Sequence, residues 1–236
     1  MKEETREKLM GVSVATLATA LFKRGLRNQV IQGVHPVGWK GKNMVGPAFT
    51  LRYMPAREDR NPITCFRNAD HPQRVAIESC PPGSVLVMDS RKQAAAASAG
   101  DILITRLMMR GGVGVVTDGG FRDAATIADL EIAAYHTRPS SPTNLTNNEA
   151  IGINEPIGCG DAPVFPGDII VGDADCVIVI PADIADEIAD EAVEMTAYED
   201  FVVERVKEGE TIIGLYPCTK DQHQADFKVW REKNGR

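Results

Sequence analysis

Two aspartates and one arginine form a set that can bind a small anion beside a metal ion. Twenty residues separate Asp101 from the adjacent pair Arg122 and Asp123. The planar guanidinium of arginine matches a carboxylate, and aspartate oxygens suit a hard cation such as Mg²⁺. A 2-keto acid can use both groups, because its carboxylate and keto oxygen chelate a cation that stabilises the enolate formed when the bond beyond C3 breaks.

The elements predicted around these residues place them at the edge of a sheet. Residues 102–110 have apolar side chains at helical spacing, two glycines end that helix, and residues 113–117 follow as a buried strand. Arg122 and Asp123 then stand where a strand end meets the next helix, a frequent position for small-molecule sites in α/β folds. Backbone amides of residues 100–103, at the first helical turn, would add donors for a carboxylate.

Each residue taken alone has a structural interpretation as well. Asp123 can cap the helix that begins with DAATIADL, an interaction worth ~1 kcal/mol. Arg122 can be an exposed loop arginine, which is the usual environment of that residue type. The joint spacing with Asp101 is what favours a site.

The block from residue 100 to residue 123 resembles the motif of the RraA-like family, which includes the class II pyruvate aldolase acting on 4-hydroxy-4-methyl-2-oxoglutarate and 4-carboxy-4-hydroxy-2-oxoadipate. Four further segments match family landmarks in family order: SVATLATALFKRG, GPAFTLRY, PPGSVLVMD and PGDIIVGDADCVIVIP. The resemblance covers roughly residues 13–209. It implies an α/β fold, a swivelling β/β/α domain with N- and C-terminal helical extensions, as one domain over residues 1–236 with a C-terminal tail at 210–236.

The resemblance also implies roles for individual residues. Arg122 matches the arginine that binds the pyruvyl carboxylate, Asp123 the aspartate that holds the metal, and Asp101 the aspartate that orients water on the metal. Leu103 matches a position whose backbone amide contacts the substrate. The expected metal is Mg²⁺, with Mn²⁺ or Co²⁺ as alternatives, because oxygen ligands distinguish Mg²⁺ from Mn²⁺ poorly. The expected substrate-binding residues are Gly100, Ile102, Leu103 and Arg122.

Two features concern the completeness of the site. The aldolase pattern has an acidic residue three positions after the metal aspartate, where this chain has Thr126. Family members form trimers, sometimes stacked as hexamers, in which a glutamate from a neighbouring subunit enters the site. Glu199 is the candidate here, with Glu194 and Asp200 as alternatives. A solvent-exposed helix face is the competing interpretation of Glu199.

The function expected from the resemblance is a divalent-metal-dependent lyase. It would cleave a 4-hydroxy-2-keto acid by a retro-aldol reaction, release pyruvate, and decarboxylate oxaloacetate through the same enolate. Thr126 keeps a second possibility open, an aldolase or dehydratase for a keto acid derived from a sugar acid. A third is a non-catalytic regulator of a ribonuclease, since some family members regulate an RNA-degrading endonuclease by contacting it.

Composition sets the remaining expectations. The chain has 236 residues, 43% of them hydrophobic, and a net charge of −7, which argues against general nucleic-acid binding. Its five cysteines show no paired spacing typical of a zinc site. An odd cysteine number and the lack of an apolar signal segment predict a cytoplasmic location, and no apolar run is long enough to cross a membrane.

Other elements follow from periodicity and turn residues. Residues 55–72 are expected to form a loop that can cover the site, and 136–148 a second loop. His136 and Arg138 either reach the distal part of a substrate or are ordinary structural and surface residues. A helix is expected from Ser13, a short one at 75–79 and a long one at 182–207, with strands at 45–53, 85–88, 131–135, 151–157, 169–171 and 176–180.

Overall fold

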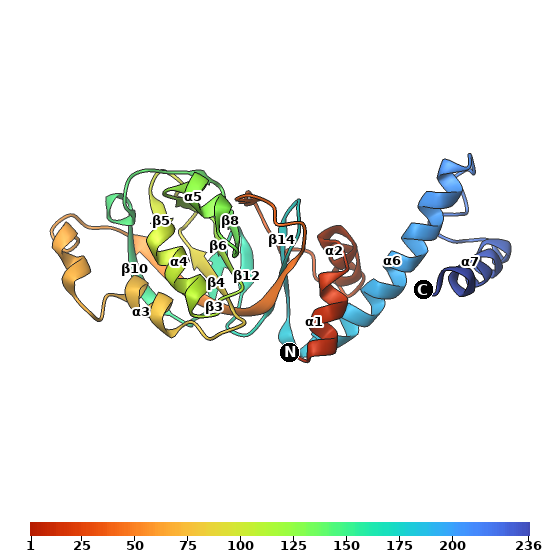
Figure 1. The fold of residues 1–236 in the computed structure, drawn as a ribbon, viewed down its shortest axis with the longest axis horizontal. Coiled ribbons are helices and arrows are strands. Elements are labelled where there is room, and N and C mark those ends of the chain that lie inside the picture. Colours follow the sequence, from red (N-terminus) through yellow and green to blue (C-terminus); the bar gives the residue numbers. More distant parts are fainter.

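A nine-stranded mixed sheet forms the centre of the α/β body (Figure 1). The computed structural model describes residues 1–236. Four neighbouring strands run parallel: β3 (Met44–Pro55), β4 (Val85–Asp89), β6 (Gly114–Thr117) and β8 (Ala133–His136). Three strands pair antiparallel with this set: β13 (Ile169–Gly172) and β10 (Asn148–Ile153) with β3, and β2 (His35–Pro36) with β8. Beyond β13 the sheet continues antiparallel through β14 (Val177–Ile180) to β1 (Val30–Ile31).

Three short helices connect the parallel strands in succession. They are α3 (Pro72–Ser79), α4 (Asp101–Met109) and α5 (Ala124–Asp129). Their apolar faces pack on the sheet, where Leu86, Ile104, Leu107 and Ile127 are fully buried in one core cluster. The alternation of parallel strands and helices brings the ends of several strands to one edge of the body.

A second, three-stranded parallel sheet lies beside the main one. It consists of β5 (Ala97–Ala99), β7 (Gly120–Phe121) and β9 (Arg138–Pro139). β5 runs directly into α4, and β7 is followed by Arg122, Asp123 and then α5. A hairpin of β11 (Ile157–Cys159) and β12 (Ala162–Val164) completes the strands.

Helices at both chain ends extend the body. The long helix α6 (Ala185–Lys207) leads away from the sheet, with α1 (Glu3–Met10) and α2 (Val14–Lys23) along its first half (Figure 1). Leucine, isoleucine and alanine side chains of these three helices share a second core with β13 and β14. None of the helices combines the length and the apolar composition that crossing a bilayer demands.

The C-terminal segment docks on the far half of α6 through aromatic side chains. Phe201 of α6 packs against Phe227 and Trp230 of α7 (Asp221–Asn234), with ring centroids 5.6 and 5.9 Å away. The indole N–H of Trp230 donates a 2.7 Å hydrogen bond to Glu204 Oε2. Residues beyond 210 therefore form a helical extension. The aromatic cluster that packs it on α6 consists of Tyr198, Phe201, Phe227 and Trp230.

The α/β fold with helical extensions is confirmed, and most expected elements are present within a few residues. The strand expected at 151–157 is wrong. The chain turns at Asn154, whose φ of +56° is left-handed, and so divides that segment into β10 and β11. The segment expected to be a loop at 55–72 contains a 3-10 helix, Ile63–Arg67.

Replacing Phe201 by Ala tests the aromatic cluster. The side chain is 1% exposed, so its truncation should lower the free energy of unfolding by about 3 kcal/mol or more, measured by urea denaturation. Phe22→Ala is the matched control, because Phe22 is 60% exposed and its loss should cost within about 0.5 kcal/mol. Equal losses in the two variants would contradict the docking of α7 on α6.

Candidate active site

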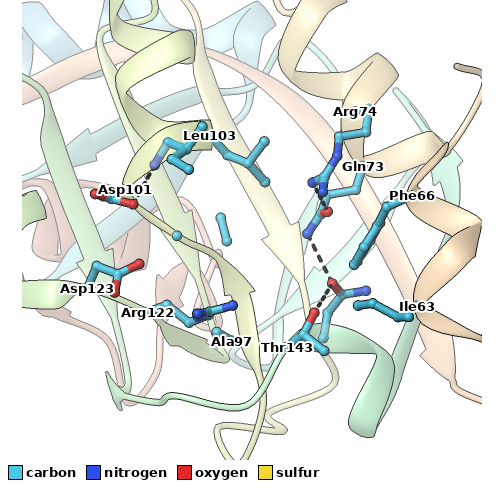
Figure 2. A pocket seen from close by; sticks show the side chains of 14 residues that line it. Ile63, Phe66, Gln73, Arg74, Ala97, Asp101, Leu103, Arg122, Asp123 and Thr143 are labelled. Carbon is cyan, nitrogen blue, oxygen red and sulfur yellow. Dashed lines mark hydrogen bonds between the residues drawn. The ribbon is translucent and has the colours of Figure 1, made fainter.

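A cavity of about 500 Å³ opens at the edge of the body where β5 enters α4 (Figure 2). All six residues singled out from the sequence in the block 100–123 lie on its wall. The full lining is Ile63, Phe66, Gln73, Arg74, Ala97, Ala99, Gly100, Asp101, Ile102, Leu103, Arg122, Asp123, Thr143 and Asn144. The structure therefore brings the predicted group together, from segments twenty residues apart.

Asp101 is the first residue of α4 and stands at the positive end of that helix. Its Oδ1 accepts a 2.7 Å hydrogen bond from the Ile102 N–H. The Leu103 N–H finds no acceptor within the chain, as is usual for the first turn of a helix. This helix start offers free backbone donors and a favourable dipole to an anion in the cavity.

Asp123 lies on the same cavity wall as Asp101 and has an unusual backbone conformation (Figure 2). Its φ of +55° and ψ of +37° are left-handed, which costs a residue with a side chain about 1 kcal/mol or more. Although it precedes α5, its carboxylate accepts no capping hydrogen bond. The capping interpretation is therefore wrong, and the carboxylate instead lies beside Gly100, where an added Cβ would come within 3.1 Å of Oδ2.

Arg122 is anchored by its backbone and free at its side chain. Its N–H donates a 2.9 Å hydrogen bond to the Ala99 carbonyl, which holds the loop after β7 against β5. In Figure 2 the guanidinium extends away from Asp123 towards Thr143. No carboxylate of the chain forms an ion pair with it, so its donors are available to a ligand.

The opposite wall was predicted only in part, since the segment 55–72, which was expected to cover the site, contributes Ile63 and Phe66. It includes Arg74 and Gln73 of α3 and Phe66 of the 3-10 helix, which Figure 2 shows across the cavity from Asp101 and Asp123. The Arg74 guanidinium stacks over the Phe66 ring, with 4.3 Å between Cζ and the ring centroid. No motif marks these residues, and only the docking of α3 and the preceding loop brings them to the site.

The donor set on the wall fits a hydrated hard cation. Asp101 and Asp123 supply two carboxylates, and no group of three potential metal-ligating side chains exists in the chain. Mg²⁺ is commonly held by one or two carboxylates together with waters and substrate oxygens. The space that Gly100 leaves beside Asp123 Oδ2 suits such an arrangement. Thr126 is exposed on α5 and does not line the cavity.

Glu199 does not line the cavity of its own chain, and it belongs to the second half of α6, the helix that leads away from the body (Figure 1). It accepts hydrogen bonds from the hydroxyls of Thr16 (2.7 Å) and Tyr216 (3.2 Å). The two alternatives, Glu194 and Asp200, form ion pairs with Arg231 and Arg236. Glu199 is thus the one of the three without a cationic partner.

His136 and Arg138 do not reach the cavity. Arg138 is exposed on β9, and His136 is 7% exposed at the end of β8, stacked on Phe121 with ring centroids 5.5 Å apart. Burial, helped by the charge of His35, lowers the pKa of His136 to about 4. Its Nδ1 has no hydrogen-bond partner, which agrees with a neutral ring that serves packing.

Comparison with known proteins identifies one family over most of the chain. The sequence model of the RraA-like family, described as Aldolase/RraA, matches residues 14–179. Protein DlpA of Legionella pneumophila is 26% identical over 208 residues, 87% of this chain and 32% of DlpA. A Halalkalibacterium halodurans protein, named for a proposed 4-hydroxy-4-methyl-2-oxoglutarate aldolase activity, is 37% identical over 109 residues, 45% of this chain and 50% of that protein. The chain thus spans half or less of these curated relatives.

Solved structures share the fold. Streptomyces coelicolor RraAS2, described as an unusual member of the RNase ES inhibitor RraA protein family, aligns with 85% of this chain and 96% of its own. The TM-score is 0.75 and the identity 29%. A protein from Pseudomonas syringae pv. tomato has a TM-score of 0.76 at 21% identity, over 92% of this chain and 98% of its own.

The buried His136 predicts acid sensitivity. A histidine with a lowered pKa binds its proton more readily in the unfolded chain, so stability is full above pH 6.5 and falls as pH drops towards 4. In His136→Phe this part of the pH dependence, at most about 1.4 kcal/mol per pH unit for one proton, should be absent. Urea denaturation at several pH values measures it, and an unchanged pH profile would contradict a buried neutral ring.

Asp123→Asn tests the metal donor set. Removing the charge should weaken Mn²⁺ binding at least about 10-fold, measured by calorimetry, because one of two carboxylates is lost. The free energy of unfolding should stay within about 0.5 kcal/mol, since that carboxylate makes no hydrogen bond and Asn tolerates the left-handed region. Asp129→Asn, an exposed aspartate outside the cavity, is the control and should bind Mn²⁺ like the parent protein.

Proposed function

This chain belongs to the RraA-like family, and we propose that it is a divalent-metal-dependent lyase that cleaves a 4-hydroxy-2-keto acid to release pyruvate. The observation that carries the proposal is an arginine without an ionic partner, Arg122, on the same cavity wall as two carboxylates, Asp101 and Asp123. The name of the Halalkalibacterium halodurans relative supports the same reaction class.

In this proposal the protein binds the substrate by its keto acid end. Arg122 binds the C1 carboxylate through its guanidinium fork, and the free N–H of Leu103 donates to the same group at the start of α4. Asp123 would hold the divalent cation, Mg²⁺, Mn²⁺ or Co²⁺, and Asp101 would orient the water beside it. When bound, the cation supplies a Lewis acid that withdraws electrons from the keto group.

Cleavage breaks the C3–C4 bond while the 4-hydroxyl loses its proton. The electron pair of that bond passes to the pyruvate unit as an enolate, and C4 with its hydroxyl oxygen becomes the carbonyl product. Asp101 orients the water that takes the hydroxyl proton, since its carboxylate stands on the wall beside the binding groups. Protonation at C3 then gives pyruvate. Oxaloacetate, which loses CO₂ through the same enolate, should also be a substrate.

A neighbouring subunit completes the site in this proposal. Glu199 is the candidate residue, because it is partly exposed, has no cationic partner and lies on the projecting half of α6. In a trimer or hexamer that helix can reach the cavity of another copy.

Two other functions use the same fold. A keto acid derived from a sugar acid can undergo aldol cleavage or dehydration at the same groups, and the neutral Thr126 leaves room for that variant. The Streptomyces coelicolor relative, described as a member of an RNase ES inhibitor family, favours regulation of a ribonuclease by direct contact as the second function class.

The test is pyruvate release from 4-hydroxy-4-methyl-2-oxoglutarate and from oxaloacetate, with Mg²⁺ or with EDTA. We expect release with Mg²⁺ and none with EDTA. Arg122→Ala should lower kcat/KM by about 100-fold, because a charge-assisted pair to the substrate is lost. Asp129→Asn should have the activity of the parent protein. Release that survives EDTA, or an active Arg122→Ala, would overturn the assigned site. Absence of release from both compounds would overturn the lyase proposal and favour the other two functions.

A further inference from the structure

Arg74 is a half-buried arginine that lacks an ionic partner. Its Nη1 donates a 2.6 Å hydrogen bond to Gln73 Oε1, and its Nε and Nη2 make no hydrogen bond within the chain. By contrast, Glu78, which is in the same helix as Arg74, pairs with Arg106 and Arg110. Burial removes water from around Arg74 and lowers the pKa of its guanidinium, because the cation is destabilised there without an anion beside it.

The side chain is held in place by its surroundings. Gln73 is 3% exposed, and its Nε2 donates to the Ser98 carbonyl (2.6 Å) and to Asn144 Oδ1 (3.3 Å). Phe66 supports the flat face of the Arg74 guanidinium from the other side. Arg74 is therefore preorganised, with the donors that remain free on a cavity wall.

The position of Arg74 relative to Arg122 is informative. Both residues line the same cavity of about 500 Å³, and Figure 2 shows Arg74 on the wall across from Asp101 and Asp123. The residues that share its wall, Ile63, Phe66, Gln73, Thr143 and Asn144, are all uncharged. An anion on that side would meet Arg74 and no carboxylate.

We propose that Arg74 binds a second anionic group of the substrate, a carboxylate or a phosphate, at the end remote from the keto acid group on Arg122. The site would then select 2-keto acids that carry such a second group over those with a neutral tail. The keto acid end of this inference rests on the proposed function. The Arg74 end rests on its burial, its stacking on Phe66 and its free donors.

Binding of ligands that the protein cannot cleave provides the test. Calorimetry with Mg²⁺ would compare 2-oxopentanoate, which has a neutral tail, with 2-oxoglutarate and 2-oxo-4-phosphonobutanoate, which end in a carboxylate and a phosphonate. The parent protein should bind at least one of the two doubly anionic compounds about 10-fold more tightly or better than 2-oxopentanoate. The compound with the larger preference identifies the second group.

The variants are Arg74→Gln, Arg74→Lys and the control Arg106→Gln, an exposed arginine outside the cavity. Arg74→Gln should abolish the preference and leave 2-oxopentanoate binding within about 2-fold, Arg74→Lys should retain part of it, and Arg106→Gln should retain all. Equal affinities in the parent protein would overturn the inference. So would an Arg74→Gln variant, shown by its melting temperature to be folded, that binds all three compounds equally weakly.

The two proposals fail in different ways. A binding preference that depends on Arg74, in a protein that releases no pyruvate, would retain the anion site and reject the lyase. Pyruvate release whose kcat/KM falls by the same factor in Arg74→Gln, for 4-hydroxy-2-keto acids with and without a terminal carboxylate, would retain the lyase and reject the anion site.

Discussion

The parallel pairing of β5 with β7 is the constraint on which the candidate site depends. The two strands contain three and two residues, yet they align Ala97 with Gly120 and Ala99 with Phe121. The hydrogen bond from the Arg122 N–H to the Ala99 carbonyl continues that pairing by one step. Because each strand leads directly to the start of a helix, the pairing places the first turn of α4 beside the residues that precede α5. Residues that are more than twenty positions apart in the sequence therefore lie next to one another.

A buried network of hydrogen bonds stabilises these short strands. Ser98 of β5 shares hydrogen bonds with Ser90 (2.6 Å) and Thr117 (2.7 Å), which follow β4 and end β6. Next to Thr117, the Asp118 carboxylate is 1% exposed and accepts backbone N–H bonds from residues 90, 92 and 160. Burial raises the pKa of Asp118, while these donors oppose that effect. The ends of two main-sheet strands and β5 are therefore one connected unit, and movement in any of them would disturb the cavity wall.

The sequence predicted the wall that carries Asp101, Arg122 and Asp123, because that wall is built from contiguous segments with clear helix and strand periodicity and a family motif. The wall that carries Arg74 could not be predicted in the same way. It combines α3 with a polar, proline-containing segment that has no periodicity, and their meeting at β5 depends on tertiary packing and on hydrogen bonds such as Gln73 to Ser98. The capping interpretation of Asp123 failed for a related reason, since aspartate is common both at helix N-caps and in the left-handed region, and its residue type does not distinguish the two.

The charges of the cavity give a final argument about what it can bind. Its charged residues are Arg74, Arg122, Asp101 and Asp123, so the positive and negative side chains cancel. A divalent cation on the two aspartates would leave the cavity with two positive charges, in a chain whose net charge is −7. A keto acid with a second carboxylate carries two negative charges and would neutralise the cavity, whereas a singly charged one would leave one positive charge without a counter-charge. Two features of the cavity are unfavourable for the protein alone, the half-buried Arg74 without an ionic partner and the left-handed backbone of Asp123. A dianionic ligand bound with its cation would give both Arg74 and Arg122 an anionic partner.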